Sequence, residues 1–202
     1  MSLGKLAIRG VVGPLFIGHG TQKLFGWFGG HGLEGTAGFF EQAIGLRPGK
    51  RHATAAGASE ALGGALLTLG AFTPIAASMI IGTMVTAIRK VHAPKGPWVT
   101  EGGYEYNAVI IATMFAIAES GPGTPALSPR MKGTGWALLA LGAGVAGSYL
   151  ATEYFNEPEP AAPETGTEGQ SRFARDEGPA SDDARFDTGQ TATEAPAPPA
   201  AG

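Results

Sequence analysis

Apolar residues in the first three quarters of the chain gather into five long stretches separated by glycine, proline and charged residues. The stretches cover residues 6–28, 53–72, 74–91, 104–120 and 133–151. Each is about 17–23 residues long, the length that a helix needs to cross roughly 30 Å of hydrocarbon. They are apolar around most of the helical circumference, whereas helices of soluble domains keep a polar face. The pattern therefore predicts an all-α fold, a polytopic bundle of membrane helices.

Taken singly, each stretch also fits the buried core helix of a soluble protein, and the first has the basic start of a signal peptide. No small-residue cleavage pattern follows it, and four further apolar stretches come later. Glycines recur within the stretches, and in lipid such small residues allow helix backbones to approach closely. Between the first two stretches, residues 35–46 place Ala37, Phe40 and Ile44 at helical spacing. We interpret this segment as a short helix on the membrane surface or across the end of the bundle.

Successive spans reverse direction, so polar residues from different spans are expected to meet. Five spans place loops 29–52 and 92–103 and the C-terminal tail on one side of the membrane, which we call side B. The N-terminus and the loop before the fifth span lie on the opposite side A. Polar side chains fall in the side-B halves of the first four spans or at their side-B ends: His19, Gln22, Lys23, Glu60, His92, Glu105 and Asn107. These residues are predicted to form a polar intramembrane cluster.

Glu60 is the strongest candidate in this cluster for a functional role. Its helical neighbours Ala56 and Gly64 are small, which suits a face turned into the bundle. A charge at membrane depth costs a few kcal/mol unless it faces protein, water or a partner. Lys23 and His19 are its natural partners, because the first span carries both on one helical face.

Structural interpretations stay open beside the functional one. Lys23 can extend to the membrane interface, His19 can pack in the core, and Glu60 can be a hydrogen-bonding centre that fixes helix packing. Arg89 and Lys90 are typical of interfacial residues that set topology.

The remaining histidines add little to the prediction. A metal site built from His19, Glu60 and His92 lacks a local ligand motif, so we predict no metal. His31 and His52, in the first loop, carry no signal of their own.

The last fifty residues differ in composition from the rest of the chain. From Glu153 onward there are eleven acidic residues and three arginines, a net charge of −8, which leaves +5 for residues 1–152. Two phenylalanines are the only large apolar side chains in residues 156–202. Such a segment buries too little surface to offset its ordering entropy, so we predict a disordered acidic tail over residues 153–202. It is either a solvated tail or a docking segment for a partner.

The chain contains no cysteine, which excludes disulfides, thiol catalysis and cysteine-ligated metals. Side B carries six basic residues and side A carries four. By the positive-inside rule this margin favours a cytoplasmic side B, with the acidic tail also in the cytoplasm.

Three segments resemble the signature segments of the DoxX family of membrane proteins. They are GHGTQKLFGWFGGHGLEGTAGFFE (18–41), GASEALGGALLTLGAFTPIAA (57–77) and HAPKGPWVTEGGYEYN (92–107). The matched positions are Gly18, His19, Gly20, Gln22, Lys23, Gly26, Glu60, Gly64, His92, Gly102, Gly103, Tyr104, Glu105 and Tyr106. The resemblance implies a four-helix membrane domain over residues 1–125, of bacterial or archaeal type. The fifth transmembrane helix (126–152) and the tail fall outside it.

The resemblance also implies a role beside redox enzymes, such as sulfur-compound:quinone oxidoreductases and thiol-handling or superoxide-defence enzymes. It assigns no catalytic role to the matched positions. We therefore expect an integral protein of the bacterial cell membrane, at most a non-autonomous subunit of an oxidoreductase complex.

Three functions from different classes fit these observations. The first is an accessory or quinone-interacting subunit of a redox system, in which His19, Gln22 or Lys23 donates to a quinone carbonyl while Glu60 and Glu105 conduct protons. The second is a small transporter or channel subunit, which with five spans requires a homo-oligomer. The third is a membrane anchor that recruits a partner through the acidic tail. We expect a quinone as the candidate cofactor, no covalently held cofactor, the lipid bilayer and a redox enzyme as partners, and no nucleic acid.

Overall fold

The computed structural model describes residues 3–128 and 131–160, and this part of the chain is helical without strands. Its α-helices are α1 (Leu3–Phe25), α2 (Gly32–Ile44), α3 (Gly49–Leu69), α4 (Thr73–Ala87), α5 (Glu105–Ser120) and α6 (Thr134–Tyr149). Short 3-10 helices are η1 (Trp27–Gly29), η3 (Ala93–Lys95) and η4 (Val99–Glu101). The π-helices η2 (Ile88–His92) and η5 (Leu150–Tyr154) extend α4 and α6. The predicted all-α fold is confirmed, whereas most of the predicted disordered tail, residues 161–202, lies outside the described residues.

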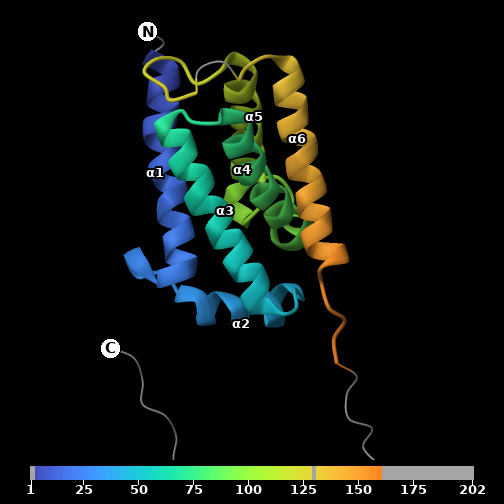
Figure 1. The fold of residues 1–202 in the computed structure, drawn as a ribbon. Coiled ribbons are helices and arrows are strands. Elements are labelled where there is room, and N and C mark those ends of the chain that lie inside the picture. Colours follow the sequence, from blue (N-terminus) through green and yellow to red (C-terminus); the bar gives the residue numbers. More distant parts are fainter. Residues whose placement is uncertain (1–2, 129–130, 161–202) are drawn as a thin grey trace, which may run out of the picture. The chain divides into compact units, whose positions relative to one another are not determined.

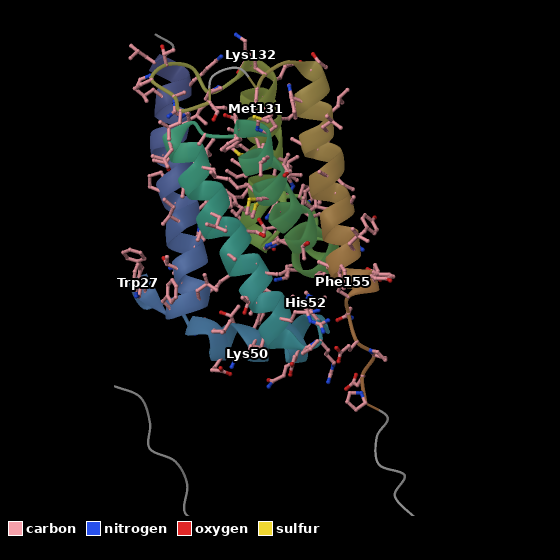
Figure 2. All side chains as sticks on the ribbon, viewed as in Figure 1. Trp27, Lys50, His52, Met131, Lys132 and Phe155 are labelled. Carbon is pink, nitrogen blue, oxygen red and sulfur yellow. The ribbon has the colours of Figure 1, made fainter. Side chains whose placement is uncertain are left out.

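A long helix occurs at each of the five predicted stretches, and α2 lies across one end of them (Figure 1). Trp27, Lys50, His52 and Phe155 lie toward this end, and Met131 and Lys132 lie at the other (Figure 2). The closely packed pairs are α1–α3, α4–α6, α3–α4, α2–α3, α4–α5 and α5–α6. The buried apolar core comes mainly from α4 and α5, with Phe16 and Leu67 from α1 and α3.

Two helical segments within the described residues are long and apolar enough to cross a membrane by length and composition, Thr73–Lys95 and Thr134–Tyr154. α1 has 23 residues, but Arg9 and Lys23 lower its hydropathy, and α5 has only 16 residues. Large apolar side chains are exposed on the outer faces of the bundle, among them Leu62 and Leu139. An outer surface of this kind suits contact with hydrocarbon rather than with water.

α1 and α3 approach each other closely because glycines face each other across their interface. A Cβ atom added at Gly20 would lie 2.5 Å from the carbonyl oxygen of Gly57, and one at Gly64 would lie 2.5 Å from that of Gly13. Both distances are far shorter than real side-chain contacts, so neither position accepts a larger residue without movement. Small residues at such interfaces drive helix association in lipid, where the hydrophobic effect between helices is absent.

The fifth long helix is an integral part of the bundle. Gly144 of α6 packs against Ile81 of α4, and Thr86 Oγ1 donates a hydrogen bond to Ser148 Oγ at 2.8 Å. At the end of α4 the Arg89 guanidinium donates to Thr152 Oγ1 at 2.9 Å, with its Cζ atom 3.6 Å from the ring centre of Tyr149. α6 therefore fixes the end of α4.

The tail begins in contact with the bundle. Glu153 forms an ion pair with Arg89 at 2.7 Å, and Glu157 forms one with Arg51 at 3.3 Å. Basic residues near the side-B end thus hold the first acidic residues of the tail by charge.

Arg9 is buried, although it lies near the start of the chain. Its guanidinium is surrounded by backbone carbonyls and donates to those of Leu67, Thr68, Pro122 and Pro125 at 2.7–3.0 Å. Those carbonyls belong to the last turn of α3 and to the loop after α5. Arg9 therefore links α1 to two other segments at the side-A end, and its hydrogen-bond donors are satisfied where a lone charge would be costly.

Replacing Arg9 by lysine keeps the charge but removes the planar, branched donor group that reaches several carbonyls. We expect the midpoint of thermal unfolding in detergent to fall by several degrees, since each charge-assisted hydrogen bond contributes about 1.5–3 kcal/mol. The exposed Lys50→Gln variant is the control and should shift the midpoint by about a degree at most. An unchanged midpoint for Arg9→Lys would contradict the role given to these carbonyl contacts.

Candidate functional site

A cavity of about 800 Å³ occupies the half of the bundle nearest α2. All six α-helices contribute to its walls, together with the segment that joins η2 to α5. Most of the lining is apolar, including Phe16 from α1, Phe40 and Ile44 from α2, and Met79 from α4. Its size falls within the range of cavities that bind small molecules.

Lys23 and Glu60 form an ion pair in the wall of this cavity. Lys23 Nζ lies 2.5 Å from Glu60 Oε2, and the two side chains are 28% and 6% exposed. The close packing of α1 on α3 brings them together, because Lys23 lies one turn beyond Gly20, which contacts Gly57. The pair therefore depends on the same glycine interface as the helix packing.

His19 and Gln22 lie beside the pair on α1. His19 lines the cavity, its ring packs edge-on against Phe16, and its Nδ1 donates to Gln22 Oε1 at 3.2 Å. Gln22 is not among the lining residues, because its amide turns to the carbonyl of Phe28 at 3.3 Å. Gln22 thus orients His19 and the turn after α1 rather than facing the cavity.

His92 of η2 and Asn107 of α5 also line the cavity. His92 Nδ1 donates to the carbonyl of Gly102 at 2.7 Å, which holds the segment between η2 and α5 against the end of α4. Asn107 is buried on α5, and its amide donates to Met84 Sδ at 3.3 Å. Glu105 begins α5 and does not line the cavity. The structure thus places five of the seven predicted residues at one cavity: His19, Lys23, Glu60, His92 and Asn107.

Among the further polar residues that line the cavity, His52 and Tyr106 have the largest side chains, and neither was singled out from the sequence as a site residue. His52 is buried, and its Nε2–H donates a hydrogen bond to the carbonyl oxygen of Arg47 at 3.1 Å. α3 begins at Gly49, a turn before the predicted start at residue 53, and this turn carries His52 to the cavity. A predicted helix that began one turn earlier would have indicated His52 as a site residue, since His52 shares a helical face with Ala56 and Glu60.

Tyr106 is the second of these residues. Its side chain lines the cavity at the start of α5 and is partly open to the surroundings. In the sequence, Tyr106 was noted only as one of the positions that resemble the DoxX family. It was not chosen as a site residue because an aromatic residue at a span end is usually an interfacial anchor.

In the ranges 3–128 and 131–160, no three His, Asp or Glu side chains are arranged to hold a metal ion. The cavity instead offers hydrogen-bond donors and one paired carboxylate within an apolar wall. This chemistry suits a largely apolar molecule with a polar group at one end.

Residues 4–93 match the family model described as DoxX. The match shows similarity to a DoxX domain over somewhat less than half of the chain. The matched segment spans α1 to η2 and carries the Lys23–Glu60 pair, whereas α5 and α6 lie beyond the matched residues. No curated protein and no solved structure matches the chain significantly. The similarity to DoxX and the two apolar helices that are long enough to cross a membrane indicate an integral membrane protein.

Removing one member of the ion pair tests how strongly the two are coupled. We expect Lys23→Met to lower the midpoint of thermal unfolding more than Glu60→Gln, because the first leaves a buried charge unpaired, at a cost of about 3–5 kcal/mol. After Glu60→Gln, by contrast, the flexible lysine can extend outward. The double variant should recover much of the loss. Strictly additive effects of the two substitutions would contradict a coupled pair.

Proposed function

We propose that this DoxX-like protein is an accessory subunit of a membrane redox system and binds a quinone in the cavity beside the Lys23–Glu60 pair. The observation that carries the proposal is a largely buried ion pair in the wall of a mostly apolar cavity. A quinone has matching chemistry, since its ring and tail are apolar and its carbonyl oxygens accept hydrogen bonds. When bound, it supplies a reversible carrier of electrons and protons.

The donor set fits a carbonyl oxygen. The Lys23 ammonium has three N–H donors, and its ion pair with Glu60 uses one of them. Apolar side chains such as Phe16 and Met79 offer surfaces on which a ring can pack. The chain itself holds Lys23 in position through Glu60, so the carboxylate acts as a positioning group for the donor.

A partner must supply the electrons. The sequence has no cysteine for a cluster or a redox disulfide, which is why the proposed role is that of a subunit rather than of an enzyme acting alone. The same cavity is also compatible with a transporter, and the acidic tail with an anchor, and the experiments below separate these functions.

Binding of a radiolabelled short-tailed quinone, decylubiquinone, to the protein in nanodiscs tests the proposal. We expect Glu60→Gln and Lys23→Met each to weaken binding by about tenfold or more, equivalent to about 1.4 kcal/mol. Glu34 and Lys50 form a matched control, because they are also an ion pair, at 2.6 Å, but are 80% and 64% exposed outside the cavity. Glu34→Gln and Lys50→Met should leave binding unchanged. Equal binding by all four variants would refute a site at the pair.

The redox role has its own test in the host membrane. We expect Glu60→Gln to lower quinone-linked activity of the membrane while the amount of protein stays the same, since the variant loses the positioned donor. Normal activity at normal abundance would argue against the redox role. Uptake of solutes by liposomes that contain only this protein would favour a transporter. Loss of function on deletion of residues 156–202, with no effect of Glu60→Gln, would favour an anchor.

A further inference from the structure

One side of the cavity, between α3 and α6, is built from small side chains. They are Ala55, Ala56 and Ser59 on α3, and Ala143, Gly147 and Ala151 on α6. Ser78 and Gly82 of α4 line the cavity between the two helices. Because no large side chain closes this side, the cavity continues as a narrow passage over the surface of α4.

This side opens onto the outer surface of the bundle. α3 and α6 each pack closely on α4, but they are not a closely packed pair themselves. Ala55, Ala143 and Gly147 line the cavity and are at the same time exposed. The cavity is therefore continuous with the surroundings between these two helices.

The surface next to this opening is apolar. Leu139 lies one turn before Ala143 on the same face of α6, and Leu62 lies two turns after Ala55 on the same face of α3; both side chains are more than half exposed. Elsewhere the exposed lining residues are the polar His19 on α1 and Tyr106 on α5, and the apolar Phe39 on α2 and Val99 before α5. The α3–α6 side is thus the one at which small side chains join the cavity to the apolar outer faces of two long helices.

We propose that the passage between α3 and α6 holds the hydrocarbon tail of the bound quinone and leads it from the cavity to the lipid. This inference rests on the proposed function and extends it to the length of the ligand. A quinone ring held at Lys23 and Glu60 fills part of the cavity, whose volume is about 800 Å³. A long isoprenoid tail is larger than the volume that remains. The tail must leave the cavity, and hydrocarbon leaves at lowest cost through a wall of small, mostly apolar side chains without charged groups.

The chain offers a matched pair of positions for a test. Gly142 and Gly147 both lie on α6, both are exposed, and an added Cβ atom meets nothing within 4 Å at either. Only Gly147 lines the cavity. A leucine is thus accepted by the fold at both positions but fills the passage at one of them.

The test compares two quinones, decylubiquinone and the tail-less duroquinone. Their binding is measured for the Gly147→Leu and Gly142→Leu variants in nanodiscs. We expect Gly147→Leu to weaken decylubiquinone binding by about tenfold, because several methylene groups lose their place, and to leave duroquinone binding within about twofold. Gly142→Leu should bind both quinones like the unmodified chain.

The outcomes separate this inference from the proposed function. If Gly147→Leu binds both quinones normally while Glu60→Gln binds neither, the tail lies elsewhere and the passage is refuted, although the quinone site stands. Equal weakening of both quinones by Gly147→Leu would also refute a tail passage. If neither quinone binds the unmodified chain, the proposed function fails first. A change in oligomeric state in Gly147→Leu, measured by light scattering, would show that a second copy of the chain covers this side and would overturn the proposal.

Discussion

The close packing of α1 on α3 determines most of what this protein can do. Facing glycines bring the two backbones so near that a methyl group at Gly20 or Gly64 would collide with the opposite helix. In lipid this contact cannot rely on the hydrophobic effect, so shape and hydrogen bonding must supply the association. Lys23 and Glu60 lie at the end of this interface, where each charge needs the other in a setting of low polarity.

The rest of the bundle is arranged around that pair of helices. At the side-A end, Arg9 joins α1 to the end of α3 and to the loop after α5 through backbone carbonyls. At the side-B end, Arg89 joins α4 to α6. Between these links all six α-helices contribute to the cavity, which lies in the half of the bundle nearest α2.

Hydropathy alone predicted the long helices well, because each apolar stretch carries its own signal in consecutive residues. Glu60 also stood out, since an acidic residue among alanines and glycines is costly anywhere but against a partner. The burial of Arg9 was not predicted, because its carbonyl partners come from residues 67–68 and 122–125 and no local pattern indicates them. His52 was passed over because the helix begins one turn earlier than its apolar residues suggest. Turns, π-helical ends and the cavity arise from contacts between distant segments, which one sequence does not display.

The central claim is that a lipophilic molecule with a polar head binds inside the bundle beside Lys23 and Glu60. Photolabelling with an azido-substituted quinone in nanodiscs, followed by mass spectrometry of the peptides, tests it most directly. The account predicts labelling on the cavity faces of α1 and α3, within residues 16–23 and 52–60, and loss of this label when excess decylubiquinone is added. Labelling confined to outward-facing residues such as Leu138 and Leu139, unaffected by excess decylubiquinone, would contradict it.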